Sequence, residues 1–296
     1  MMTETSTAQS QVPLSFTFTE GERRVFRRRE PITVSEWAEQ HRIVERGPAP
    51  GKWSNAVTPY LREIMDCWNV PWIRKIILCF APQTGKTQVA FNCLGYSIDQ
   101  DPGPAMYVMP DERVTKRISR RRLIPMIRRS PRLSALLSAK AFDTTAYHIN
   151  FRNGMDLMMA WATSAAELSS ESVQYLIMDE MDKWPDSAGK EADPSALAEM
   201  RTNAYPHTKK ILYLSTPTDD TGNISQVMEK EADEVRRYHV PCPVCGEYQL
   251  MVFDQIVWPK DVREPRRLIR ERLARYACVK CGMLWTDAMR NDACRI

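Results

Sequence analysis

The sequence lacks the long apolar runs and the cysteine framework that would indicate a membrane or secreted protein. No apolar run approaches the roughly 20 residues that cross a bilayer, and no apolar signal-peptide region stands at the N-terminus. Of the eight cysteines, four form two C-x-x-C pairs and the others are scattered, unlike a disulfide framework. We therefore expect a reducing, intracellular setting and no membrane partner.

The net charge of the chain is also small. A formal charge of +4 over 296 residues is mildly basic, which suits a protein that binds a polyanion but does not require one. The length and the 43% hydrophobic content allow one large core with a small appended module. Residues 1–30 combine a Ser-, Thr- and Gln-rich start with a basic stretch, and we expect a disordered or basic arm there.

Apolar strands alternate with helical segments through the middle of the chain. This alternation predicts an α/β fold over residues 31–240, with a doubly wound, mostly parallel sheet that carries helices on both faces. Beyond it, residues 241–296 form a cysteine-bearing unit with a charged helical part at about 266–276, and we place the boundary near Val240. The expected strands are 73–80, 105–109, 147–151, 157–161, 175–179 and 211–215, and the expected helices are 33–43, 87–98 and 111–127.

A glycine-lysine-threonine loop follows the first of these strands directly. In residues 81–87, Ala-Pro-Gln-Thr-Gly-Lys-Thr, backbone N–H groups would point at phosphates, Lys86 would meet the β and γ groups, and Thr87 would ligate Mg²⁺. A glycine usually stands five residues before the second one, but Phe80 stands there, so the loop alone could be a chance match. The expected ATP ligands are Gln83, Thr84, Gly85, Lys86 and Thr87.

Two carboxylates end the apolar strand at 175–179. Asp179 at the strand tip would hold Mg²⁺, and Glu180 would orient and deprotonate the attacking water. Such a pair at the carboxyl end of a buried strand lies where doubly wound sheets place their chemistry. A strand that simply ends in solvated acids is the alternative, and it is weakened because two motifs occur together in their correct contexts.

A third apolar strand, at 211–215, runs into small hydroxyl residues. In translocases such a strand lies beside the strand with the acid pair, where its hydroxyls sense the γ-phosphate. The candidate coupling residues are Ser215, Thr216 and Pro217. Taken alone, the segment is equally a strand followed by a turn.

Bases cluster in the expected helix at 111–127. Several of them fall on one side at 3.6 residues per turn, while apolar residues fall on the other. An ordinary solvated face would mix in more acids, and here the acids stand only at the N-terminus, where the helix dipole favours them. We take Arg117, Arg120, Arg121 and Arg122 as candidates for contact with nucleic-acid phosphates or for a catalytic arginine.

Two C-x-x-C pairs, each followed by a glycine, stand near the end of the chain. Thiolates at this spacing on a tight turn present both sulfurs to one tetrahedral ion. We expect a structural Zn²⁺ on Cys242, Cys245, Cys278 and Cys281 in a zinc-ribbon-like module. Redox cysteines or a pair of turns without metal are the alternatives.

The order of these motifs resembles the large terminase subunit of tailed phages, lambda-type family. The shared pieces include Gly51-Lys52-Trp53, residues 58–66, the 81–87 loop, residues 179–185, Ser215-Thr216-Pro217 and residues 242–247. The resemblance implies a P-loop motor of the RecA/ASCE-like kind that uses ATP and Mg²⁺ to package double-stranded viral DNA. It also implies a small terminase subunit, a portal protein and a ring of copies as partners, in the host cell cytoplasm.

Two departures from the family mean that no arginine of this chain can be matched to the family's catalytic arginine. Many terminases carry an arginine inside the phosphate loop, where this chain has Pro82, and residues 163–174 contain no base. An arginine from a neighbouring subunit would fill this role. Residues after Cys281 leave no room for a nuclease, so we expect the ATPase portion of a longer terminase. The alternatives are a helicase-like translocase and a non-catalytic zinc protein that binds nucleic acid.

Overall fold

The computed structural model describes residues 17–19, 22–23, 31–45, 47, 49–189 and 193–295. The chain separates into two compact units, residues 1–30 and residues 31–296. Within the first unit only residues 17–19 and 22–23 are described, so most of the expected N-terminal arm lies outside the described residues. The elements below belong to the second unit.

A six-stranded sheet forms the centre of the unit, in the order β3-β8-β7-β4-β6-β5. Its first five strands are parallel, and β5 pairs antiparallel with β6 at one edge. Strands β4, β7 and β8 are buried along their whole length, which explains their continuous apolar runs. The mostly parallel α/β fold is confirmed. The strands are β3 (Lys75–Cys79), β4 (Ala105–Met109), β5 (His148–Asn150), β6 (Asp156–Trp161), β7 (Tyr175–Asp179) and β8 (Lys210–Ser215).

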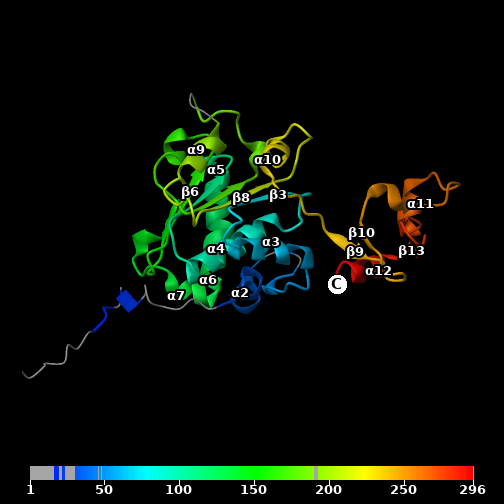
Figure 1. Ribbon diagram of the computed structural model, residues 1–296, viewed down its shortest axis with the longest axis horizontal. Coiled ribbons are helices and arrows are strands. Elements are labelled where there is room, and N and C mark those ends of the chain that lie inside the picture. Colours follow the sequence, from blue (N-terminus) through cyan, green and yellow to red (C-terminus); the bar gives the residue numbers. More distant parts are fainter. Residues whose placement is uncertain are drawn as a thin grey trace, which may run out of the picture. The chain divides into compact units, whose positions relative to one another are not determined.

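Alternate residues of the central strands supply two separate cores, one on each face of the sheet. Tyr107 and Ile177 belong to the first core, whereas Met106 and Met178 belong to the second. Helices cover both faces, and Figure 1 shows α9 and α10 on one side with α2, α6 and α7 on the other. The first face carries α2 (Val34–His41), α4 (Lys86–Gln100), α6 (Ile124–Arg129) and α7 (Pro131–Leu136), and the second carries α8 (Ala165–Leu168), α9 (Pro194–Met200) and α10 (Asn223–Glu231).

The segment before the sheet packs on α4. Helix α2 begins at a capping box in which Thr33 and Glu36 exchange hydrogen bonds. Trp37, fully buried, donates from Nε1 to Asp99 Oδ2 at 2.9 Å and lies against Gly95, where an added Cβ would stand 2.4 Å from its ring. The expected helix at 33–43 is thus confirmed in slightly shorter form. Two short strands, β1 (Ile43–Val44) and β2 (Gly51–Lys52), and helix α3 (Arg62–Asp66) complete this part.

The expected basic helix is helical over its whole length but not uniform. It consists of α5 (Glu112–Ile118), a five-residue π turn at Ser119–Leu123 and then α6. Asp111 caps its N-terminus by accepting from Val114 N at 2.8 Å. A π turn accommodates one extra residue and is frequent at functional sites.

Small elements built around a third, minor core make up the C-terminal part. Strands β9 (His239–Pro241) and β10 (Tyr248–Leu250) form a hairpin, and β11 (Ile256–Val257), β12 (Arg275–Ala277) and β13 (Leu284–Trp285) form a three-stranded sheet. The expected charged helix at 266–276 is wrong in its second half. Helix α11 (Pro265–Arg270) stops early because Arg272 has a left-handed φ of 49° and the next residues pair with β11 and β13. Helix α12 (Asp287–Ala293) is the last element along the described chain.

Among the described residues, the helices are all too short or too polar to cross a membrane.

Candidate functional site

Three loops meet at the carboxyl ends of neighbouring parallel strands. They follow β3, β8 and β7, which lie side by side in that order, so the residues after β8 stand between the glycine-lysine-threonine loop and the acid pair. In doubly wound sheets, ligands bind at this edge. The topology therefore brings all three predicted motifs to one place.

The loop after β3 has the backbone of a phosphate cradle. Gly85 has a φ of 94°, and an added Cβ there would stand 2.7 Å from Leu61 Cδ1, so only glycine fits without strain. Gln83 also adopts a left-handed φ, of 61°. Tyr60 donates to Thr84 O at 3.1 Å and holds the loop from outside. Helix α4 starts at Lys86 after Gly85, whose carbonyl accepts from Gln88 N and Val89 N at 2.9 and 3.1 Å.

Lys86 bridges the phosphate loop and the strand beside it. Its Nζ donates to the carbonyls of Phe80 and Ala81 at 2.9 and 2.8 Å and to Thr216 Oγ1 at 2.7 Å. Burial lowers the pKa of Lys86, and the carboxylates of Asp179 and Glu180 act in the opposite direction. The ammonium group therefore sits among weak oxygen acceptors that a phosphate group would outcompete.

Asp179 is buried, with 3% of its surface exposed, and three groups surround its carboxylate. Tyr107 donates to Oδ2 at 2.6 Å, the Thr87 hydroxyl lies 3.4 Å from the same oxygen, and Glu180 N donates to Oδ1 at 2.9 Å. Burial raises the pKa of Asp179, whereas the bond from Tyr107 lowers it. An adjacent hydroxyl and carboxylate are the hard oxygen donors that Mg²⁺ takes from proteins beside substrate phosphates, so these residues fit the ion.

Glu180 lies just past the strand in a left-handed conformation, with a φ of 56°. Its Oε2 pairs with Lys183 Nζ at 2.8 Å, and the two side chains are 41% and 66% exposed. Trp184 closes the turn by donating from Nε1 to Asp179 O at 3.0 Å. The carboxylate of Glu180 is thus at the open side of the site, while that of Asp179 is at its floor.

The residues after β8 connect the other two loops. Thr216 accepts from Lys86, and Ser215 Oγ accepts from Asp182 N at 3.0 Å. Pro217 follows, half-buried, and Thr218 N donates to Asp182 Oδ2 at 2.7 Å. The predicted coupling segment is therefore hydrogen-bonded to both the phosphate loop and the acid-pair loop.

Asp182 also reaches the start of helix α10. Its Oδ1 accepts from Ile224 N at 2.8 Å, and Gly222 packs so closely that an added Cβ would stand 2.2 Å from Oδ2. Asn223 Nδ2 adds a bond to Met181 O at 2.9 Å. One carboxylate thus joins the acid-pair loop, the segment after β8 and α10.

The predicted arginines are all exposed, and they differ in what lies near them. Arg122 stacks over the Phe91 ring at 5.4 Å from its centroid, and its charge contributes to lowering the pKa of Asp179, against burial, which raises it. Arg121 lines a cavity together with Arg122. No hydrogen bond or ion pair joins Arg117 or Arg120 to the loops at the strand ends, within the residues that the structure describes.

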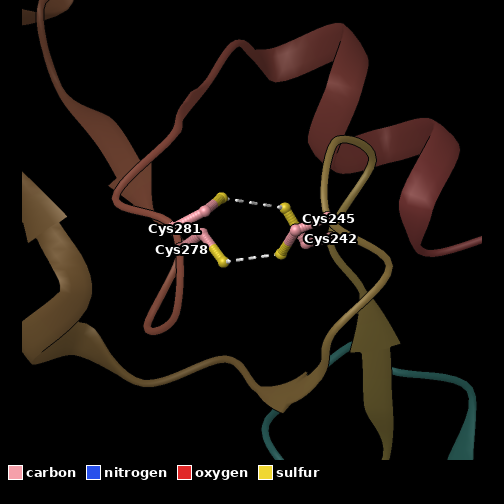
Figure 2. Close-up of side chains that lie close together, drawn as sticks. All are labelled: Cys242, Cys245, Cys278 and Cys281. Atoms are coloured by element: carbon pink, nitrogen blue, oxygen red, sulfur yellow. Dashed lines mark hydrogen bonds between the residues drawn. The ribbon is translucent and has the colours of Figure 1, made fainter.

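The four predicted cysteines form one cluster, which Figure 2 shows as two facing pairs. The four Sγ atoms lie within 4.8 Å of one another, with 3.9 Å between those of Cys242 and Cys281 and 3.7 Å between those of Cys245 and Cys278. Four sulfurs at 2.3 Å from a tetrahedral zinc would be separated by roughly 3.8 Å. The donor set and its spacing therefore fit Zn²⁺.

The two turns that carry the cysteines have the same construction. In each, the glycine after the second cysteine has a left-handed φ, 74° at Gly246 and 69° at Gly282, and its N–H bonds back to the carbonyl of the first cysteine. The backbone N–H of Cys281 is the largest cause that lowers the pKa of Cys278, to about 6, and so favours the thiolate. Gln249, buried, donates from Nε2 to Cys278 Sγ at 3.5 Å.

Two residues with contacts to the predicted motifs did not emerge from the sequence as site residues. Tyr107 sits in the middle of β4, and only the pairing of β4 with β7 brings it to Asp179. Asp182 stands within the acid-rich segment after β7, but its partners lie 33 to 42 residues further along the chain. No local sequence signal reveals either contact.

Comparison with known proteins matches this chain to large terminase subunits of phages. The model of the family described as phage terminase large subunit gpA, ATPase domain, matches residues 47–296. The large terminase subunit of Enterobacteria phage P21 is 25% identical over 228 residues, which cover 75% of this chain and 35% of that protein. That of Escherichia phage lambda is 25% identical over 283 residues, which cover 88% of this chain and 44% of that protein. The chain thus spans less than half the length of these curated relatives.

A solved structure supports the fold. The crystal structure of the HK97 bacteriophage large terminase matches with a TM-score of 0.53 and 14% identity, over 78% of this chain and 46% of that one. The family match covers most of the chain and includes the loops after β3, β7 and β8 as well as the four cysteines. The chain belongs to the family of phage terminase large subunit gpA ATPase domains.

Proposed function

We propose that this chain hydrolyses ATP with Mg²⁺ and uses the energy to move double-stranded viral DNA into a procapsid. One observation carries the proposal. The Thr87 hydroxyl and the Asp179 carboxylate meet 3.4 Å apart at the strand ends, beside a loop whose Lys86 faces oxygen acceptors only. A phosphate cradle and a buried acid in this arrangement are the two halves of a nucleotide-hydrolysing site.

Each residue has a distinct role in the proposed reaction. Backbone N–H groups of residues 83–87 and the Lys86 ammonium hold the phosphates, and Thr87 with Asp179 would hold Mg²⁺. Bound Mg²⁺ would neutralise charge that develops on the phosphates. Glu180, on the open side, orients the attacking water and accepts its proton once its carboxylate leaves Lys183.

The segment 215–217 would transmit the state of the nucleotide. Lys86 donates to Thr216 at 2.7 Å, and a bound γ-phosphate would draw that ammonium away. The loss of this bond changes the environment of the segment that Asp182 ties to α10. The site thus has a physical link by which hydrolysis reaches a helix outside it.

The exposed bases near the site supply two further proposed functions. Arg117, Arg120, Arg121 and Arg122 contact DNA phosphates or complete the active site of a neighbouring copy. An arginine that arrives from another chain can be worth about 10³ to 10⁵ in rate. A finger variant would lose turnover at every salt concentration, whereas a DNA-contact variant would keep basal turnover and lose DNA stimulation.

The remaining proposals rest on membership of the family and on the cysteine cluster. The partners are the small terminase subunit, the portal protein and further copies in a ring, and the setting is the host cytoplasm. A full-length terminase would also carry an endonuclease. Residues 31–240 act as the ATPase domain and residues 241–296 as a module that one structural Zn²⁺ stabilises.

An ATPase assay with and without double-stranded DNA, run beside a strand-unwinding assay, tests the function. We expect ATP turnover that DNA stimulates and no unwinding. Unwinding of a duplex would favour a helicase-like translocase instead. DNA binding without any turnover, in the presence of Mg²⁺ and of the assembled partners, would leave only a binding protein.

A further inference from the structure

A buried arginine without an acidic partner lies beside the proposed nucleotide site. Arg42, at the end of α2, is only 2% exposed. Its guanidinium donates from Nη1 to Ile43 O and from Nη2 to Gln88 Oε1 at 2.9 Å, and its Nε has no hydrogen-bond partner in the part of the chain that the structure describes. Among the described residues, no carboxylate forms an ion pair with it. A buried cation in this state is costly unless an anion accompanies it.

A cavity of about 30 Å³ opens next to this guanidinium. Arg42, Gln88, Arg121 and Arg122 line it, and the volume accepts about two water-sized groups, such as two oxygens of an oxyanion. Arg121 and Arg122 are exposed, so solvent reaches the cavity from their side. Glu45 is the acid at its wall, and that carboxylate pairs with Arg129 at 3.3 Å.

A π turn places two of the three arginines at the cavity. Arg121 and Arg122 stand in the π turn at Ser119–Leu123, between α5 and α6. The extra residue of a π turn shifts the side chains that follow it around the helix axis, and such turns are frequent at functional sites. Burial lowers the pKa of Arg42 to about 9, and the positive charge of Arg122 acts in the same direction. Like charges held together in this way call for a negative ligand.

We propose that Arg42, Arg121 and Arg122 form a binding site for a phosphate group, separate from the phosphate loop. The site lies beside the first turn of α4, because Gln88, which accepts from Arg42, follows Thr87 there. The phosphate belongs either to the DNA backbone or to a nucleotide. The existence of the site stands on its own geometry, and only the choice between these two sources rests on the proposed function.

Inorganic phosphate is the first probe, measured by thermal unfolding of the full chain. The Lys86→Ala background removes the phosphate loop as a competing site. In that background we expect phosphate to raise the unfolding midpoint relative to potassium chloride of equal ionic strength. Adding Arg122→Ala should weaken the phosphate affinity at least tenfold, and Arg122→Lys should restore part of it.

Arg113→Ala is the matched control, because Arg113 is an exposed base of α5 that does not line the cavity. It should leave the phosphate shift unchanged. Arg42→Gln serves as a second variant, and Arg122→Ala keeps the test valid if that buried change prevents folding. No phosphate shift in Lys86→Ala, or a shift that Arg122→Ala leaves intact, would overturn the site.

Two further arms identify the source of the phosphate. A DNA source predicts at least tenfold weaker binding of a short duplex to Lys86→Ala/Arg122→Ala than to Lys86→Ala/Arg113→Ala. A nucleotide source predicts instead a loss of ATP affinity when Arg122→Ala is made in the chain with Lys86 intact. A phosphate shift in Lys86→Ala, together with no ATP turnover by the unmutated chain in the presence of Mg²⁺, DNA and the assembled partners, would refute the proposed function and leave this site standing.

Discussion

The replacement of Glu180 by glutamine separates water activation from nucleotide binding. The amide keeps the size of the side chain and cannot accept the proton, so turnover should fall by about 10² to 10⁴, the usual contribution of a general base. ATP binding should persist, because the proposed phosphate ligands are Lys86 and Thr87, whose side-chain hydrogen bonds run to Phe80 and Asp179 among others, while the Glu180 carboxylate pairs with Lys183. Turnover by phosphate release and affinity by a fluorescent ATP analogue measure the two effects.

Lys183→Met is a control variant, because it removes the ion pair with Glu180 and leaves the carboxylate in place. Both side chains are largely exposed, at 41% and 66%, so solvent screens the pair and it is worth about 0 to 1 kcal/mol. Breaking it with Lys183→Met should therefore change turnover at most about fivefold, since a tenfold change takes about 1.4 kcal/mol. If Glu180→Gln keeps more than a tenth of the turnover, another residue is the base and the assignment is wrong.

Three more changes test other parts of the molecule. If one Zn²⁺ holds the cluster, elemental analysis should give about one zinc per chain and Cys278→Ser should lower stability, and protein purified without chelator that contains no zinc would refute this. Gly85→Ala should abolish ATP binding in an equilibrium assay, because the left-handed backbone and the contact with Leu61 both oppose a Cβ, and normal affinity would show that the loop adapts. Asp182→Asn replaces one acceptor oxygen with an NH₂ donor that faces a backbone N–H, so denaturant unfolding should show a loss of about 1–3 kcal/mol, and an unchanged midpoint would mean that the bonds from Thr218 and Ile224 contribute little.

The local elements of the site were predictable because their signals are local. Buried strands such as β7 and β8 are continuous apolar runs, and the residues that we propose as phosphate ligands follow strand β3 directly. The helix after Arg266 was predicted too long for the opposite reason. Its residues favour a helix, but the pairing of Tyr276 with Ile256 and Trp285 draws the end of the segment into a strand. Tertiary pairing overrides propensity there, and a single sequence does not reveal it.

The contacts that tune the site were not predictable, since they depend on strand order and on burial. Tyr107 reaches Asp179 only because β4 lies beside β7, 72 residues away along the chain. Arg42 reads as an ordinary surface base, because arginines are almost never fully buried unless they are paired. Its position becomes informative only when the fold shows it buried without an acid.

The order of the strands would allow one segment to serve both the proposed chemistry and the proposed coupling. Strand β8 lies between β3 and β7. The residues at its carboxyl end therefore have the phosphate loop on one side and the acid pair on the other. Thr216 bonds to Lys86 and Ser215 to Asp182, each across a single strand spacing. Asp182 continues the connection to the start of α10, the last helix before the cysteine-bearing part. In the proposed motor, the strand next to both halves of the site would act as the sensor, so the coupling would need no connection over a longer distance.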